Sequence, residues 1–399
     1  MSPRPLGRPR PMYATCDAGG EEVLAQELIK LKCDEVSPAH RGVFFWGGEE
    51  TLWRVNLYSR LANRILIPLA EFPAADRKAL YEACKKIRWD WWVHSSQTIA
   101  VDASTHKSSM QHTHFIAQVV KDAVADSMRE RFEERPSVDT QNPDLPINAR
   151  ISEDFCTISL DASGARLHKR AYRIDGGPAP IKETLASLLN HLIAWRPTEP
   201  LIDLTCGSGT ILIEAALRAQ MKAVNVQRLS EEGFAFQRWR SHAKVKFESW
   251  LAQVPQPKAF PAYFWGSDIN RKQIARAIQN AESAGLENGI IHWQRADINE
   301  AAPMAKQWLD NLKIPEGQGR KAVIVMNLPY GERLKNDDQV MVKLFRDLGA
   351  QLKEHFSGCE AWLLVSDESP WREVGLKPKV QIPLRNGAIS VKLVQFDLY

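Results

Sequence analysis

Long apolar runs are missing from this sequence. The apolar stretch at 64–69 is interrupted by Pro68, whereas a membrane-spanning helix needs about 20 consecutive apolar residues. Residues 1–11 hold three arginines and four prolines with no apolar segment behind them, which excludes a secretory signal peptide. We therefore expect a cytoplasmic protein with no membrane partner and with a disordered basic arm over residues 1–11.

Paired cysteines and a strong net charge are also missing. The six cysteines lie tens of residues apart, without a CxxC pair or a Cys/His cluster at metal-ligand spacing, so we expect free thiols and no metal site. The formal net charge is only +4. Any affinity for nucleic acid must therefore come from local basic patches, because the average field is too weak to attract phosphates.

Two different patterns divide the 399 residues. The first 165 residues alternate amphipathic helices with short β-rich runs, which predicts two small α+β units in series. From residue 181 strands and helices alternate regularly, which predicts an α/β fold with a mostly parallel, doubly wound sheet. An insertion rich in Arg, Lys and Trp interrupts this alternation at 221–260. The strands expected in this second part lie at 201–205, 262–265, 290–293, 322–326, 361–365 and 389–396, and the helices at 210–219 and 272–284.

A glycine-rich turn follows the first strand of the second part. Gly207 and Gly209 lie between the apolar run 201–204 and the helix expected at 210–219. Glycines let the backbone approach a ligand closely, and such a turn brings the first N–H groups of the helix to it. The dinucleotide fingerprint GxGxxG is absent because position 212 is Leu. At this point the sequence is compatible both with a turn that binds a ligand and with an ordinary tight turn between a strand and a helix.

Carboxylates end the next two strands. Asp268 is placed to accept both hydroxyl protons of a ribose, and Asp297 to accept from an adenine amino group. Taken singly, each aspartate favours a helix N-cap. Taken in order with the glycine-rich turn, the two describe an adenosine pocket without a pyrophosphate grip, which favours S-adenosylmethionine over NAD.

The strand expected at 322–326 is followed by Asn327, Leu328, Pro329 and Tyr330. Methylating an amino group conjugated to an aromatic ring requires its lone pair to turn out of conjugation, and two acceptors on its N–H bonds achieve this. The Asn327 side-chain oxygen and the Leu328 carbonyl are suitable acceptors. Pro329 orients that carbonyl, and Tyr330 offers a face on which a flipped base stacks. No cysteine adjoins such a turn, which argues against C5-pyrimidine methylation.

These motifs resemble those of the RNA-methylase family whose members join a THUMP domain to a class I methyltransferase. The chain is most similar to the guanine-N2 methyltransferase half of the bacterial 23S ribosomal RNA enzymes. Leu204 and Leu328 depart from the family, which commonly has Pro at both positions, and an Asn-Leu-Pro-aromatic turn also occurs in THUMP enzymes that form N2-methylguanosine in transfer RNA. The resemblance is carried by 59–65, 160–164, 167–173, 179–186, 203–214 and 327–334.

The resemblance implies a domain order and a set of site residues. The implied domains are a ferredoxin-like domain at 12–70, a THUMP RNA-binding domain at 71–165, a linker at 166–180 and a class I (Rossmann-like) methyltransferase domain at 181–399 that includes the insertion. The implied cofactor-binding residues are Asp203, Thr205, Cys206, Gly207, Ser208, Gly209, Thr210, Asp268, Asp297 and Asn327. The residues implied to hold the target guanine are Asn327, Leu328, Pro329 and Tyr330.

Basic residues gather at the junction of the two halves. Phosphate contacts there would direct RNA held by the first half toward the pocket in the second, and a solvated connector is the alternative. In the insertion, where basic and aromatic residues also alternate, a cover packed on the sheet is favoured over an element that grips RNA. The junction residues expected to bind RNA are Arg166, Lys169, Arg170, Arg173 and Lys182.

The sequence therefore predicts an S-adenosylmethionine-dependent RNA methyltransferase that forms N2-methylguanosine in 23S ribosomal RNA. A transfer-RNA guanine-N2 methyltransferase is the nearest alternative. Adenine-N6 DNA methyltransferases and protein glutamine methyltransferases use similar turns, but the THUMP-like front half argues against both. A non-catalytic RNA-binding or ribosome-assembly factor is a further alternative, against which the complete set of Asp203, Gly207, Asp268 and Asn327 counts.

Overall fold

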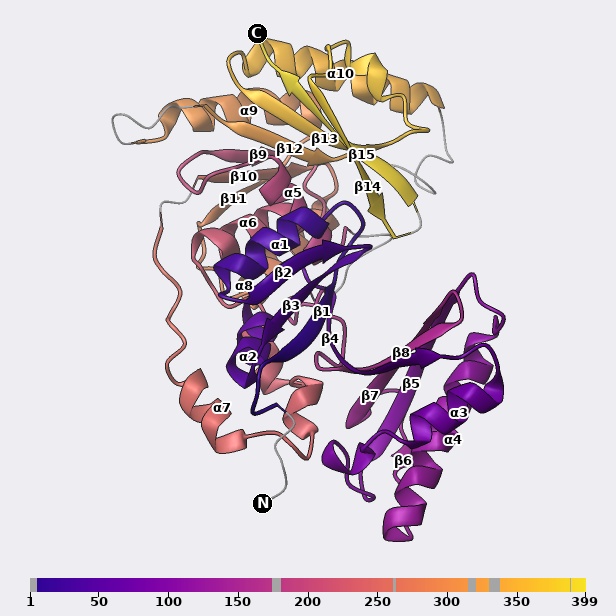
Figure 1. Ribbon diagram of the computed structural model, residues 1–399. Helices are drawn as coiled ribbons and strands as arrows, with labels where there is room; N and C mark the ends of the chain where they lie inside the picture. The colour runs from indigo at the N-terminus through magenta and orange to yellow at the C-terminus, as the bar shows by residue number, and fades with distance from the viewer. Residues whose placement is uncertain (1–5, 174–180, 261–262, 315–320, 330–337, 388) are drawn as a thin grey trace. The chain divides into compact units, whose positions relative to one another are not determined.

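The computed structural model describes residues 6–173, 181–260, 263–314, 321–329, 338–387 and 389–399. The chain folds into two compact units, each drawn from separated stretches of sequence. The first unit comprises the described parts of residues 1–16, 24–167 and 225–255, and the second those of 17–23, 168–224 and 256–399. Figure 1 shows the first unit mainly in indigo and magenta and the second mainly in orange and yellow.

The first unit is built on one eight-stranded sheet in the order β2-β3-β1-β4-β8-β7-β5-β6. Its strands are β1 (Arg10–Thr15), β2 (Asp34–Ala39), β3 (Gly42–Gly47), β4 (Arg64–Pro73), β5 (Thr98–His106), β6 (Ser137–Val138), β7 (Leu145–Ser152) and β8 (Phe155–Asp161). Its helices are α1 (Glu21–Lys30, from residue 24 on), α2 (Glu49–Tyr58), α3 (Arg77–Lys85), η1 (Trp89–Trp91) and α4 (Thr113–Phe132).

Strand β4 joins the two halves of this sheet. It pairs with β1 at one edge and with β8 at the other, over residues 66–73. The two α+β units expected in series therefore share one continuous sheet, and the boundary expected at residue 70 falls inside a strand. A ten-residue strand can do this because its two edges carry independent ladders of hydrogen bonds.

The insertion packs in the first unit rather than in the domain where the sequence analysis placed it. Its residues 225–255 form η2 (Val226–Ser230), η3 (Ala235–Arg238) and α7 (Lys244–Leu251). The ring of Trp53 on α2 contacts Phe247 and Trp250, and the Arg228 guanidinium donates to the Ser163 carbonyl at the end of β8. No local sequence pattern predicts this packing, because the apolar partners of these rings lie far away along the chain.

The second unit contains a seven-stranded sheet in the order β11-β10-β9-β12-β13-β15-β14. The pairs from β11 to β13 are parallel, and β15 runs antiparallel to both its neighbours, which confirms the mostly parallel sheet. Its strands are β9 (Leu201–Asp203), β10 (Phe264–Asp268), β11 (Ile291–Arg295), β12 (Val323–Asn327), β13 (Glu360–Ser366), β14 (Val380–Asn386) and β15 (Ile389–Asp397). Its helices are α5 (Glu183–Leu192), α6 (Thr210–Ala219), α8 (Arg271–Ser283), α9 (Ile298–Asn311), α10 (Asp338–His355) and η5 (Trp371–Val374).

Helices cover both faces of this second sheet. In Figure 1, α9 and α10 lie on one face and α5, α6 and α8 on the other. One apolar core joins the sheet to α9 and α10 through side chains such as Ala305, Phe345 and Leu363, all fully buried. Strand β9 is paired with β10 on one side and β12 on the other, so the carboxyl ends of all three strands meet at a topological switch point, where open α/β sheets bind ligands.

No helix within the described ranges is both long and apolar enough to cross a membrane.

Candidate cofactor and active site

The glycine-rich turn after β9 is held by backbone hydrogen bonds. Cys206 N donates to Ser267 O at 2.8 Å, and Gly209 N donates to Cys206 O at 2.9 Å. Gly209 has a φ of +80°, and a Cβ there would lie 2.6 Å from the Trp293 ring, whereas the Cβ position of Gly207 is open, with nothing within 4 Å. Packing therefore demands glycine at 209, and the glycine at 207 leaves room for a ligand.

The two predicted strand-end aspartates organise the neighbouring turns. The Asp268 carboxylate accepts from Gly207 N at 3.0 Å and from Asn270 N at 2.8 Å. Asp297 is the N-cap of α9 and accepts from Asn299 N at 2.8 Å. Both aspartates also line one cavity, so the capping role and a ligand-binding role are compatible in the same side chains.

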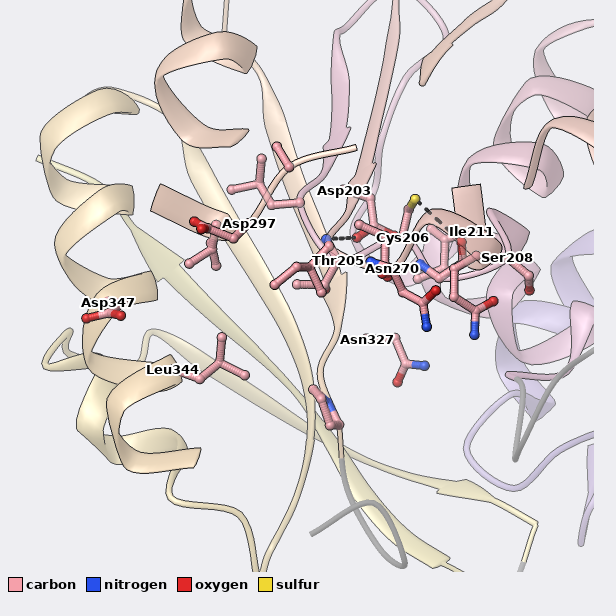
Figure 2. A pocket seen from close by; sticks show the side chains of 18 of the residues that line it. Asp203, Thr205, Cys206, Ser208, Ile211, Asn270, Asp297, Asn327, Leu344 and Asp347 are labelled. Carbon is pink, nitrogen blue, oxygen red and sulfur yellow. Dashed lines mark hydrogen bonds between the residues drawn. The ribbon is translucent and has the colours of Figure 1, made fainter. Parts of the chain in front are cut away.

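A cavity of about 620 Å³ opens at the carboxyl ends of β9, β10 and β12. Its volume lies in the range of about 300–1,000 Å³ that is usual for small-molecule sites. Figure 2 shows Leu344 and Asp347 of α10 on the wall opposite Cys206 and Ser208. Of the ten predicted cofactor-binding residues, nine line this cavity, and Gly209 is the exception.

Several lining residues escaped the sequence analysis. Asn270 and Gln273 come from the start of α8, and Lys343 and Asp347 from α10. No motif marks these positions, because α10 lies far along the chain from the glycine-rich turn and reaches the cavity only through its packing against α9 and the sheet. The aspartates at strand ends were easier to find because parallel strands place their carboxyl ends at one edge.

Burial dominates the electrostatics beside the turn. The pKa of Asp203 is raised to about 8, mainly by burial and also by the nearby Asp268 carboxylate, while the hydrogen bond from Thr205 N opposes the shift. Burial also raises the pKa of the Cys206 thiol well above its ordinary value. The Cys206 thiol is therefore protonated at neutral pH and is a poor nucleophile.

The raised pKa of Asp203 predicts a pH-dependent stability. In the unfolded chain this carboxyl titrates near pH 4, so its contribution to folding is complete below that pH and is lost as the pH rises toward 8. We expect the melting temperature of the ligand-free protein, relative to Asp203→Asn, to be lower at pH 8.5 than at pH 5.5. The amide keeps an oxygen for Thr205 N. An unchanged difference between wild type and variant at the two pH values would contradict the shift.

Three residues that line the same cavity carry buried oxygens without a partner among the described residues. Asn327 Oδ1, Thr205 Oγ1 and Gln273 Oε1 are buried and have no hydrogen-bond partner among the described residues, and all three residues line the cavity. A buried polar group without a partner costs about 1–3 kcal/mol. Thr205 Oγ1 and Gln273 Oε1 fit a ligand rich in N–H and O–H donors, as S-adenosylmethionine is through its ribose, adenine and ammonium groups, and Asn327 Oδ1 at the end of β12 suits an N–H donor of a second ligand.

The turn after β12 is only partly described. Leu328 N donates to Leu364 O at 3.3 Å, and the Leu328 side chain is buried in the core. Pro329 lines the cavity together with Asn327. Tyr330, which was expected to stack on the target base, lies outside the described residues.

The basic cluster at the junction is not one open surface. Arg166 and Lys169 are exposed, but the Arg170 side chain has no exposed area and pairs with Glu214 of α6 at 3.6 Å. This burial argues against the expectation that Arg170 binds phosphate, because a fully buried guanidinium does not reach RNA. A buried carboxylate must be paired with a cation, and Arg170 is the cation beside the buried Glu214 carboxylate.

Arg173 and Lys182 are also engaged in ion pairs. Arg173 pairs with Glu183 of α5 at 2.9 Å and donates to Thr210 Oγ1, at the start of α6, at 2.8 Å. Lys182 lies 3.5 Å from Asp17. Arg173 thus ties the junction segment to Thr210, the first residue after the glycine-rich turn.

The doubly wound sheet, the glycine-rich turn and the cavity lined by residues with unpartnered oxygen acceptors together define a class I S-adenosylmethionine-dependent methyltransferase. The family model "RMKL-like, methyltransferase domain" matches residues 170–395, a THUMP domain matches 74–161 and an "RlmL ferredoxin-like domain" matches 11–66. The chain belongs to this RMKL-like family of RNA methyltransferases.

Relatives that align with nearly the whole of this chain agree with this membership. The chain is 36% identical to a Synechocystis sp. protein provisionally named an RNA methyltransferase, over 98% of this chain and 97% of that protein. It is also 36% identical to the ribosomal RNA large subunit methyltransferase K/L of Syntrophotalea carbinolica, over 98% of this chain and 54% of that protein. The chain thus spans about half the length of the K/L relatives it matches.

A solved structure supports the cofactor. The provisionally named methyltransferase SMU.472, crystallised with SAH, superposes with a TM-score of 0.83 at 26% identity, covering 98% of this chain and 99% of that one.

Proposed function

We propose that this chain methylates the N2 atom of guanine in 23S ribosomal RNA. The observation that carries the proposal is Asn327 Oδ1, a buried acceptor without a protein partner among the described residues, on the wall of the cofactor cavity at the end of β12. Guanine N2 carries two N–H donors beside a conjugated ring. The K/L relatives, named for large-subunit ribosomal RNA, favour that RNA, and the THUMP match favours an RNA substrate generally.

The chain's own residues assign the parts of the reaction. Asp268 and Asp297 would hold the nucleoside portion of the cofactor, and the space at Gly207 lets it approach the turn. When bound, S-adenosylmethionine supplies an electrophilic methyl group. Asn327 Oδ1 and the Leu328 carbonyl accept hydrogen bonds from the two N2–H groups, which turns the nitrogen lone pair out of conjugation toward the methyl. The displaced proton leaves to solvent after transfer.

The remaining assignments concern the cellular compartment and the use of metal ions. All six cysteines are free, which is compatible with work in the reducing cytoplasm. Within the described residues there is no group of three His, Cys, Asp or Glu side chains that could hold a metal ion, and the proposed mechanism uses none.

Nucleoside analysis tests the proposal. The purified protein is incubated with methyl-labelled S-adenosylmethionine and, separately, with total ribosomal RNA and total transfer RNA from a strain lacking this protein, and the RNA is then digested. Label in N2-methylguanosine from 23S ribosomal RNA is the expected result. Label only from transfer RNA would keep the chemistry and overturn the substrate, and label in N6-methyladenosine would overturn the chemistry. No label in either RNA or in a ribosomal precursor particle would favour a non-catalytic RNA-binding factor.

A further inference from the structure

One face of the sheet in the first unit carries exposed aromatic rings. Strands β1 to β4 and helices α1 and α2 follow the chain order β1-α1-β2-β3-α2-β4, with β3 and β1 at the centre of the sheet order β2-β3-β1-β4. Side chains alternate between the two faces. Met12 and Phe45 are fully buried on one face, whereas Phe44 and Trp46 on the other are 46% and 38% exposed. Exposing two large rings on a central strand has no packing benefit.

The rings form a fixed set across the two central strands. Tyr13 of β1 lies directly opposite Phe44 of β3, with ring centroids 4.6 Å apart. The Tyr13 hydroxyl donates to His40 O at 2.7 Å, and its ring lies over Gly42, where a Cβ would come within 2.5 Å of it. The glycine and the hydrogen bond therefore hold Tyr13 in place beside Phe44, and Trp46 continues the row two residues further along β3.

The β2 side of this row is polar, whereas Pro11 of β1 lies opposite Trp46 and Leu66 of β4 lies opposite Tyr13. The residue opposite Phe44 on β2 is Ser37, and Asp34 lies opposite Trp46. Arg41, exposed, immediately precedes β3. A short row of exposed rings with polar side chains along its β2 side suits stacking on flat, polar-edged groups better than insertion of an aliphatic protein segment. These four strands are one end of the eight-stranded sheet. Their aromatic residues on β1 and β3, with Arg41 and Gly42 before the β3 rings, resemble the layout by which a four-stranded RNA-recognition sheet stacks bases.

We propose that Tyr13, Phe44 and Trp46 form a platform that stacks two or three unpaired bases of the RNA. This proposal rests on RNA being the substrate, and it names where unpaired RNA binds outside the catalytic cavity. Arg41 contacts the phosphate at the Phe44 end of the row. Because Asp34 lies at the other end, few phosphates are neutralised, and stacking rather than charge carries the affinity.

Binding of short RNA by the full chain tests the platform. Anisotropy of a labelled eight-nucleotide single strand of mixed sequence is measured for wild type, Phe44→Ala and Trp46→Ala, with a hairpin duplex as the second probe. Each substitution is expected to weaken single-strand binding about five- to a hundredfold and to leave duplex binding unchanged. The single-strand affinity should fall only weakly with salt concentration, with a slope that corresponds to about one neutralised phosphate. Phe115→Ala, which removes an equally exposed ring (47%) on α4, is the matched control and should change nothing.

The outcomes separate this proposal from the guanine-N2 reaction. Wild-type single-strand affinity in both platform variants, or equal weakening of single strand and duplex, would overturn the platform even if N2-methylguanosine forms. If aromatic-dependent binding persists while no N2-methylguanosine forms, only the proposed reaction fails. Phe44→Tyr keeps the ring and should bind as wild type, whereas a loss there equal to that of Phe44→Ala would also overturn stacking.

Discussion

Replacing Asn327 by alanine is expected to lower methyl transfer about 100- to 1,000-fold, the loss typical of removing one preorganised polar group that stabilises a transition state. Asn327 lines the cavity and its Oδ1 has no partner among the described residues, so removal of this oxygen breaks no hydrogen bond described within the protein. Affinity for S-adenosylmethionine should stay within about threefold because the turn and both aspartates remain. Single-turnover kinetics and calorimetry measure the two quantities separately.

Asn327→Asp provides the matched control for this prediction. The carboxylate keeps an oxygen where the amide has one, and the attacking nitrogen gains positive charge as the methyl arrives, so this variant should retain more activity than Asn327→Ala. Loss of cofactor binding together with turnover in Asn327→Ala would show that Asn327 holds the end of β12 in place rather than the substrate.

Arg170→Ala is expected to destabilise the protein by about 3–5 kcal/mol, since it leaves a buried carboxylate without its cation. Glu214 is 1% exposed, and Arg170 lies 3.6 Å from it. The other described groups on Glu214, the hydroxyls of Tyr172 at 3.0 Å and Ser187 at 2.7 Å, are neutral and do not replace a charge. Thermal unfolding should show a fall of roughly 10 °C, given about 2–4 °C per kcal/mol in a domain of this size.

Two further variants make this result specific. Lys169→Ala, at an exposed neighbour, should leave the melting temperature unchanged. Arg170→Met combined with Glu214→Gln removes both charges and should recover much of the lost stability, because neutral replacements of a buried pair are often tolerated. A stable Arg170→Ala protein that binds RNA more weakly would restore the original expectation of a phosphate contact.

The contrast between Arg170 and Lys169 shows why the sequence misled at the junction. Both are basic residues in a charged stretch, and nothing local separates a solvated side chain from one that pairs with a carboxylate 44 positions further along the chain. The partner, Glu214, lies on α6 directly after the glycine-rich turn. Arg170 is buried because the packing of α6 places the buried Glu214 carboxylate beside it.

The cofactor cavity was easier to predict than the junction. Asp203, Asp268 and Asn327 each end a parallel strand, and parallel strands bring such ends together whatever the rest of the chain does. The wall formed by α10 was missed, because Lys343 and Asp347 carry no local pattern of their own. Their place depends on the packing of α10 against the sheet through residues such as Phe345.

By itself, the sequence determined the βα alternation, the glycine-rich turn and the order of the strand-end side chains, because hydrophobic periodicity, backbone freedom at glycine and capping act over a few residues. Tertiary structure alone decided that 225–255 joins the first unit, that β4 unites one eight-stranded sheet, and that Arg170 is buried. These outcomes depend on which distant surfaces exclude water together, and burial of apolar rings and pairing of buried charges are properties of the folded chain.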